Sequence, residues 1–204
     1  MKILNYQDLE AKTLLEQGYI LAMPTETVYG VGVRWDDSEA YERLCRAKNR
    51  RPSKPIAVMA SPSFDFNTYF VITPQIRNVM TAFLPGPLTV LVRAKENAPE
   101  QIHLGTCVAG IRIPAKQDLL SFLSALPFPL QVTSANLSGA GATTSFEEVY
   151  DTFKDNSDVR GIVQGTCESG TPTTVVDLTG NKPIMVREGD IKLNQIEAEF
   201  YKGL

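Results

Sequence analysis

Cationic side chains are concentrated in one short segment of this chain. Six of the twenty lysines and arginines fall within twelve residues: Arg43, Arg46, Lys48, Arg50, Arg51 and Lys54. No acidic residue occurs between Glu42 and Asp65. Lysine suits a single phosphate oxygen, and arginine can hold two oxygens of one group. Cations also complement the C-terminal end of a helix, but that alternative does not explain why they continue into a proline-marked loop. The segment therefore predicts a polyanion site.

A second polar segment follows a short apolar run near the N-terminus. The run ends at Pro24, and the next residues are Thr25-Glu26-Thr27-Val28-Tyr29-Gly30-Val31-Gly32. A buried strand that ends this way delivers polar groups to the edge of a sheet, and glycines let the backbone pass close to a ligand. A strand followed by an ordinary polar turn is the alternative. Glu26 and Tyr29 could either bind a ligand or hold the loop in shape.

Two further groups of candidates stand at the ends of other expected strands. Ser134, Asn136 and Ser138 offer hydroxyl, amide and nearby backbone N–H groups to phosphate oxygens, although such a cluster is also typical of a polar turn. Arg112 alternates with apolar neighbours, so we expect it on the opposite face of its strand. It is either a surface arginine or a clamp for a small carboxylate.

Several common motifs are missing from the sequence. It contains no G-x-x-x-x-G-K-[ST] loop, and Trp35 stands where a dinucleotide fingerprint would need a third glycine. His103 is the only histidine, so a nucleophile–histidine arrangement would depend on a residue that we expect in a solvated loop. No carboxylate metal motif is visible, but Mg²⁺ that arrives with a nucleotide needs few protein ligands.

Composition describes an ordinary globular protein. The 204 residues suit one large domain or two small ones, and the net charge of −3 gives no global attraction for nucleic acid or membranes. Three scattered cysteines with no C-x-x-C pair fit a reducing compartment. We see no signal-peptide core and no apolar run of membrane-spanning length. These features predict a cytoplasmic protein that does not contact membranes.

Helical and strand patterns alternate early in the chain, whereas strands cluster late. Helices are expected at 6–17 with Asn5 as cap, from Ser38, from Pro74, around 119–126, after a capping box at Ser145, and at 193–201. Strands are expected at 19–23, 56–60, 88–93, 107–114, 130–133, 161–164, 174–178 and 184–187. We therefore expect an α/β fold: one domain over 1–204, with a core at about 5–190, a tail at 191–204 and a twisted mixed sheet flanked by helices.

Seven blocks, in order, resemble the YrdC-type (TsaC-like) threonylcarbamoyl-AMP synthases. They are Pro24-Thr25-Glu26-Thr27-Val28-Tyr29-Gly30, Lys48-x-Arg50 with Lys54-Pro55, Pro85-Gly86-Pro87-Leu88-Thr89, Arg112-Ile113-Pro114, Ser134-Ala135-Asn136-Leu137-Ser138-Gly139, Thr173-Thr174-Val175 and Arg187-Glu188-Gly189. The blocks span almost the whole chain. Any one of them could be chance, but seven in order form a specific signature.

The resemblance implies a mixed sheet with a large concave face and a reaction that joins L-threonine, bicarbonate and ATP, with Mg²⁺, into threonylcarbamoyl-AMP and pyrophosphate. Partner proteins would pass the threonylcarbamoyl group to tRNA beside the anticodon, and some members are described as binding double-stranded RNA. The family's nucleotide contacts map onto Lys48, Arg50, Lys54, Ser134, Asn136, Ser138 and Arg187, the first two being catalytic. Its threonine contacts map onto Thr25, Arg112, Thr173 and Thr174.

The sequence departs from the family pattern at several points. Arg51 stands where proline is usual, Met59 where longer members carry a histidine near threonine, and Thr173 where serine is common. We also expect a chain without the second domain of the long members, so that closure over ATP comes from the tail or a partner. The alternative function is a non-catalytic paralogue that binds double-stranded RNA or nucleotide. A carbamoyl-handling subunit of a hydrogenase-maturation protein is a weaker one.

Overall fold

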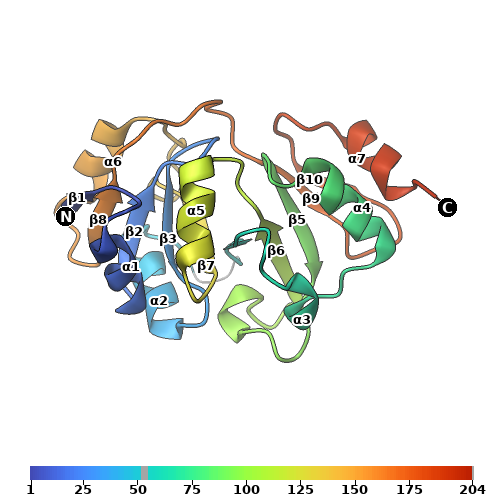
Figure 1. Cartoon of the computed structure of the whole chain (residues 1–204), viewed down its shortest axis with the longest axis horizontal. Coiled ribbons are helices and arrows are strands. Elements are labelled where there is room, and N and C mark those ends of the chain that lie inside the picture. The colour runs from blue at the N-terminus through green and yellow to red at the C-terminus, as the bar shows by residue number, and fades with distance from the viewer. Residues whose placement is uncertain (52–54, 204) are drawn as a thin grey trace.

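A computed structural model describes residues 1–51 and 55–203 and shows one ten-stranded mixed sheet with helices packed against it (Figure 1). The strands are β1 (Lys2–Leu4), β2 (Ile20–Met23), β3 (Gly30–Arg34), β4 (Val58–Met59), β5 (Leu88–Arg93), β6 (Val108–Arg112), β7 (Leu130–Ser134), β8 (Val159–Val163), β9 (Thr174–Asp177) and β10 (Ile184–Arg187). Their order across the sheet is β1-β8-β2-β3-β7-β4-β6-β5-β9-β10. The expected α/β fold with a single mixed sheet is confirmed.

Helices cover the sheet unevenly. They are α1 (Leu9–Glu16), α2 (Ser38–Ala47), α3 (Phe66–Tyr69), α4 (Pro74–Phe83), α5 (Gln117–Ala125), α6 (Phe146–Phe153) and α7 (Leu193–Phe200), with a short 3-10 helix, η1 (Glu100–Ile102). The larger hydrophobic cluster includes buried residues of α1, α4, α5 and α7, and the smaller one joins α2 and α6 to β2 and β3. Burial of these apolar stripes provides most of the driving force for folding.

Alternation along β6 opens one side of the sheet for a ligand. Ala109 and Ile111 are fully buried in the larger cluster, whereas Val108, Gly110 and Arg112 face a cavity. The same change of face separates Val90 from Thr89 on β5. A period of two is what a strand imposes, and the expectation that Arg112 points away from its apolar neighbours is confirmed.

The sequence did not predict a strand at Gly30 and Gly32, and the alternative that placed them in an ordinary polar turn is wrong. Both lie in β3, which pairs antiparallel with β2 and β7 near the middle of the sheet. A Cβ atom added at Gly30 would lie 2.8 Å from one Val132 methyl group, and one at Gly32 would lie 3.0 Å from the other. Close packing of β3 on β7 therefore requires glycine here, although Gly30 also lines the cavity.

Both ends of the chain belong to the folded unit. β1 was not expected from the sequence, yet it pairs parallel with β8. Ile196 and Phe200 of α7 are buried in the larger cluster, so one face of α7 in the expected tail packs onto the core. The first helix begins at Leu9 and not at Tyr6, because Asp8, not Asn5, is its N-cap residue. No described helix is long and apolar enough to cross a bilayer.

Candidate active site

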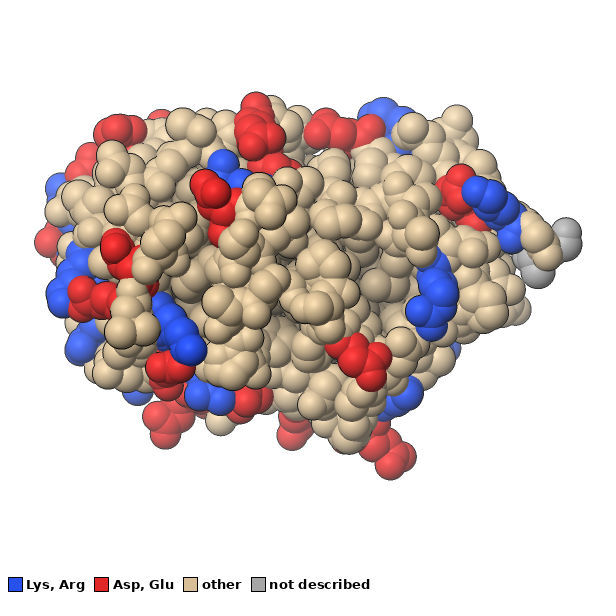
Figure 2. All heavy atoms as spheres, in the orientation of Figure 1, with Lys and Arg blue, Asp and Glu red and all other residues tan. Residues whose placement is uncertain are grey.

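A cavity of about 510 Å³ lies over β5, β6 and β9. Polar side chains from eight separate parts of the chain line it, among them Thr27, Arg50, Thr89, Thr106, Arg112, Thr133 and Ser134, Thr173 and Arg187. Three of these are arginines, and no aspartate or glutamate belongs to the described lining. A concave site that collects cations in this way has a positive potential and favours anionic ligands. Charges of both signs are interspersed on the face seen in Figure 2.

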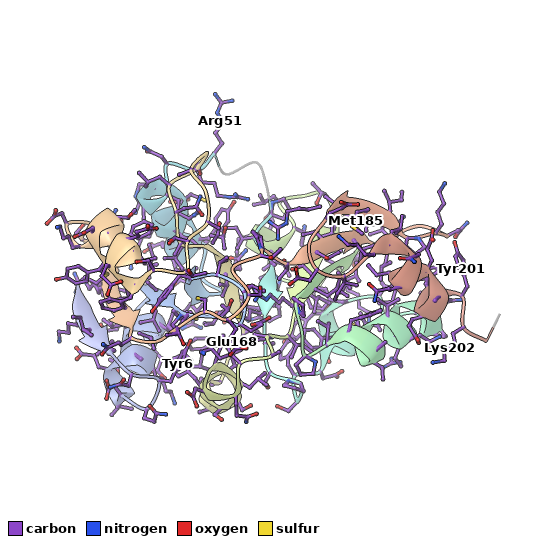
Figure 3. The ribbon with its side chains drawn as sticks, turned by 90° about the horizontal axis from the view of Figure 1, so that it is seen from above. Tyr6, Arg51, Glu168, Met185, Tyr201 and Lys202 are labelled. Carbon is purple, nitrogen blue, oxygen red and sulfur yellow. The ribbon has the colours of Figure 1, made fainter. Side chains whose placement is uncertain are left out.

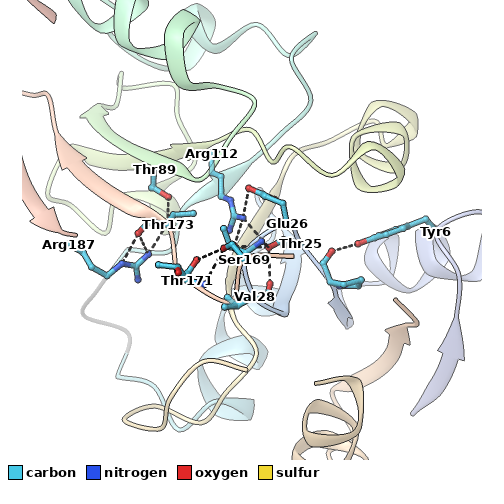
Figure 4. A network of polar contacts seen from close by, with 12 residues as sticks. Tyr6, Thr25, Glu26, Val28, Thr89, Arg112, Ser169, Thr171, Thr173 and Arg187 are labelled. Carbon is cyan, nitrogen blue, oxygen red and sulfur yellow. Dashed lines mark hydrogen bonds and ion pairs between the residues drawn. The ribbon is translucent and has the colours of Figure 1, made fainter. Parts of the chain in front are cut away.

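Arg112 is held at the cavity by the Thr25–Thr27 segment. Its Nη2 donates to Thr27 Oγ1 at 2.8 Å, to Glu26 Oε1 at 3.0 Å and to Thr25 Oγ1 at 3.1 Å (Figure 4). Thr25 Oγ1 donates in turn to the Val28 carbonyl at 2.8 Å. Thr25 and Thr27 are both buried, but only Thr27 belongs to the cavity lining.

Arg187 is fixed on the opposite side of the cavity. It donates to the Thr173 carbonyl from Nε at 2.9 Å and from Nη2 at 2.7 Å, and Nη2 also donates to Thr173 Oγ1 at 2.8 Å. Thr173 and Thr89 share a hydroxyl contact of 3.0 Å. Burial, and then the nearby positive charge of Arg112, lower the pKa of Arg187 from its usual range. The positive charges of the two guanidinium groups therefore repel each other, and an anion bound between them would reduce this repulsion.

Thr174 points away from the cavity. Its hydroxyl donates to the Ile191 carbonyl at 2.9 Å and accepts from the Ile191 backbone N–H at 3.1 Å. Strand alternation puts Thr173 and Val175 on the cavity side and Thr174 in the fully buried layer. Of the adjacent pair Thr173 and Thr174, both assigned to substrate contact from the sequence, only Thr173 lines the cavity.

Lys48 is buried and bonded to backbone. Its ammonium group donates to the carbonyls of Ser134 and Asn136, and its own carbonyl accepts from the Ser138 N–H at 2.9 Å. Burial, and then the charge of Arg50, lower the pKa of Lys48 to about 8. Lys48 therefore joins the end of α2 to the loop after β7, and it lies behind the cavity wall and not in the described lining.

Of the predicted cluster Ser134, Asn136 and Ser138, only one member lines the cavity. Ser134 lines the cavity, whereas the Asn136 amide donates to the carbonyls of Leu137 and Ala140 at 2.9 and 2.7 Å. Ser138 is exposed and outside the lining. The structure thus brings Ser134 to the cavity and uses Asn136 to shape the loop.

The cation segment splits into separate roles. Arg50 lines the cavity and donates to the Pro55 carbonyl at 3.3 Å. Arg43 and Arg46 form ion pairs on α2, and Arg51 is exposed and extends away from the body of the protein (Figure 3). Lys54 lies outside the described residues. The local sequence shows only where the charges cluster, so it could not separate one cavity arginine from surface ion pairs.

Tyr29 and Glu26, left open by the sequence, both shape the loop around the cavity. The Tyr29 hydroxyl donates to the Gly165 carbonyl at 2.8 Å, and burial raises its pKa well above the usual range. Glu26 forms the ion pair with Arg112. Thr27 and Thr89 were not among the predicted site residues. Thr89 ends the Pro85-Gly86-Pro87-Leu88-Thr89 block, which is the sequence signal that could have identified it.

Three comparisons bear on the identity of the chain. A family model described as "Telomere recombination" (Sua5/YciO/YrdC) matches residues 13–189. A threonylcarbamoyl-AMP synthase of Pyrococcus abyssi is 30% identical over 92% of this chain but 55% of its own length. A putative threonylcarbamoyl-AMP synthase of Methanocaldococcus jannaschii is 28% identical over 96% of this chain and 95% of its own. The chain thus spans about half of the Pyrococcus protein.

Two solved structures extend these matches. P. abyssi Sua5 complexed with L-threonine aligns with a TM-score of 0.88 at 28% identity, covering 99% of this chain and 61% of that one. E. coli YciO aligns with a TM-score of 0.83 at 26% identity, covering 92% and 91%. The seven sequence blocks, the family model over 13–189 and these two folds agree, and the chain belongs to the Sua5/YciO/YrdC family.

Proposed function

We propose that this protein makes threonylcarbamoyl-AMP and pyrophosphate from L-threonine, bicarbonate and ATP. One observation carries the proposal: the cavity gathers Arg50, Arg112 and Arg187 with no described carboxylate in its lining. All three substrates are anionic or carry a carboxylate. The cavity volume of about 510 Å³ falls within the usual range for a small-molecule site of roughly 300–1,000 Å³.

The chemistry requires placement of anions more than a nucleophile on the protein. The threonine amine forms a carbon–nitrogen bond to CO₂ or bicarbonate, and an oxygen of the resulting carbamate attacks the α-phosphorus of ATP while pyrophosphate leaves. One anion must approach another, so fixed cations and orientation supply the rate enhancement. The described lining offers hydroxyls, guanidinium groups and backbone, but no histidine, cysteine or carboxylate.

The positions of the side chains support the following residue roles. Arg112 would bind the threonine carboxylate, with the hydroxyls of Thr27 and Thr173 on either side. Arg50 and Arg187 would bind the phosphates, with Ser134 beside them. Lys48 would act from behind by holding the loop after β7. Mg²⁺ would enter as the ATP complex, which needs few protein ligands.

Transfer of the threonylcarbamoyl group to tRNA through partner proteins belongs to the same proposal. Its support is the printed name of the relatives, threonylcarbamoyl-AMP synthase. The alternative is a family member that binds nucleotide or double-stranded RNA without making the adenylate. The near end-to-end match to YciO, whose relatives bear the name "Uncharacterized protein YciO", favours keeping it as a second candidate.

Pyrophosphate release separates the two functions. The purified protein with ATP, Mg²⁺, L-threonine and bicarbonate should release pyrophosphate, and omission of either threonine or bicarbonate should abolish the release. A protein that binds ATP but releases no pyrophosphate would support the paralogue. Release that is indifferent to threonine and bicarbonate would contradict the synthase.

A further inference from the structure

The ion pair between Glu26 and Arg112 lies at the edge of the cavity, and only one of its two partners lines the cavity. Arg112 lines the cavity, whereas Glu26 does not. The two side chains are 11% and 8% exposed, so the pair is largely shielded from solvent. In Figure 4, Arg112 lies between Glu26 and the Thr173–Arg187 side of the cavity. Glu26 can therefore affect a ligand only through Arg112.

All described bonds of the Arg112 guanidinium use one nitrogen. Nη2 carries the bonds to Glu26, Thr25 and Thr27, and within residues 1–51 and 55–203 neither Nε nor Nη1 has a hydrogen-bond partner. A guanidinium presents five N–H donors in a rigid planar fork. Holding it by one nitrogen fixes the plane and leaves Nη1 for an incoming carboxylate, whereas Nε is buried.

Glu26 is the part of this anchor that carries charge. Thr25 and Thr27 offer neutral hydroxyls, and a hydrogen bond between ionised partners is roughly twice as strong as a neutral one. An arginine side chain loses several rotatable bonds when it binds a ligand, and an arginine already held in place loses less. The carboxylate therefore contributes preorganisation that the two hydroxyls alone would not supply.

The backbone of Glu26 is fixed independently of its side chain. Its carbonyl accepts from the N–H groups of Glu168 at 3.2 Å and Ser169 at 3.0 Å, and the Thr27 carbonyl accepts from Gly170 at 2.9 Å. These bonds join the Arg112 anchor to the segment that leads into Thr173 and β9. Glu26 thus connects the two sides of the cavity.

A gain in folding stability does not explain the buried ion pair between Glu26 and Arg112. Glu26 Oε2 is buried and has no hydrogen-bond partner among the described residues. Leaving one oxygen of a buried carboxylate unpaired costs free energy, and a buried ion pair is weak evidence for stabilisation. Departures of this kind from the rules of stability are expected at functional sites.

We propose that Glu26 is a positioning residue, which holds Arg112 by Nη2 in the orientation that receives the carboxylate of the amino-acid substrate. This inference rests on the proposed function for the identity of the substrate. The hold on Arg112 itself is a property of the ligand-free protein and can be measured without any substrate.

The first experiment is a double-mutant cycle read by calorimetric titration with L-threonine. Glu26→Ala should raise the dissociation constant on the order of tenfold, the scale of one charge-assisted hydrogen bond. Glu26→Gln keeps an acceptor of the same shape and should recover part of that loss. Adding Glu26→Ala to Arg112→Ala should cause no further change, because coupled residues are not additive. ATP affinity should be unaltered.

Glu168→Gln is the matched control. This substitution removes one negative charge from the neighbouring segment. The Glu168 side chain, however, is 68% exposed and pairs with Lys116, not with Arg112. This variant should bind threonine as the wild type does. Additive effects of Glu26 and Arg112, equal losses for threonine and ATP, or tighter threonine binding by Glu26→Gln would each overturn the proposal.

The second experiment uses the ligand-free protein. Nitrogen-15 NMR should show separate, slowly exchanging Nη2 protons for Arg112, assigned by their absence in Arg112→Lys. They should merge or vanish in Glu26→Ala while the backbone spectrum stays folded. Unchanged signals in Glu26→Ala would overturn the hold on Arg112. If the wild type shows the signals but does not bind threonine, the proposed function fails and the positioning of Arg112 stands.

Discussion

Replacing Arg112 by alanine should raise the L-threonine concentration needed for half-maximal pyrophosphate release by about a hundredfold, with little change in the requirement for ATP. Truncating one partner of a desolvated, charge-assisted contact typically costs about 2–5 kcal/mol. Arg112 is the cavity arginine beside Thr27 and across from Thr173, where we propose that the amino acid binds. Steady-state kinetics with each substrate varied in turn measures the effect.

Arg77→Ala is a control for the loss of an arginine elsewhere. Its guanidinium bonds the exposed Asn67 side chain far from the cavity lining. This variant should keep wild-type kinetics for both substrates. Equal losses for threonine and ATP in Arg112→Ala would show that the arginine serves both substrates, against the division of roles given above.

Lys48→Met should weaken ATP binding and also lower the thermal midpoint. Methionine keeps the length of the side chain but cannot donate to the Ser134 and Asn136 carbonyls, so the Asn136 carbonyl loses the Lys48 donor while the Ser134 carbonyl keeps its bond from the Asn136 N–H at 3.0 Å. The loop after β7 would then be held to the end of α2 by the Ser138 N–H bond to the backbone carbonyl of residue 48 alone, and the proposed nucleotide side of the cavity would be less well fixed. Arg50→Ala is the matched comparison, because it removes a cavity cation and should reduce ATP affinity with a smaller effect on the thermal midpoint.

The Lys48 contribution also depends on pH. Its folded pKa of about 8 lies below the ordinary value of 10.5, because burial disfavours the charged form. Between these values the unfolded chain holds the proton more tightly, so the free energy of unfolding should rise as pH increases from 8 to 10.5. The gain is at most roughly 3 kcal/mol and is absent below pH 8. Denaturant titrations across this range should show a shallower rise in Lys48→Met. If the free energy of unfolding rose equally with pH in the wild type and in Lys48→Met, the lowered pKa of Lys48 would be contradicted.

The sequence identified the strand that carries Arg112 because alternation with apolar neighbours is a local pattern. β3 was missed because two of its five residues are glycines, which are poor strand formers, and the reason for them lies in Val132 of another strand. The start of α1 was misplaced because several residues near 5–8 can cap a helix and only the folded chain selects Asp8. Long-range packing decided both cases.

The candidate site shows the same division. Residue types and order were enough to suggest Arg50, Arg112, Thr173, Ser134 and Arg187, which the fold brings to one cavity. The separation of Thr173 from Thr174 depends on the phase of β9, and the bonds of Lys48 depend on backbone carbonyls 86 and 88 residues away. Neither distinction is present in a motif, so the sequence assigned neighbouring residues to one role.

The most direct test of the central claim is the identity of the product. The protein is incubated with ATP, Mg²⁺, L-threonine and carbon-13 bicarbonate, and the nucleotide products are analysed by mass spectrometry. Threonylcarbamoyl-AMP that carries one labelled carbon is the predicted result. Only unreacted ATP, or an adenylate of threonine without the labelled carbon, would contradict the proposed function.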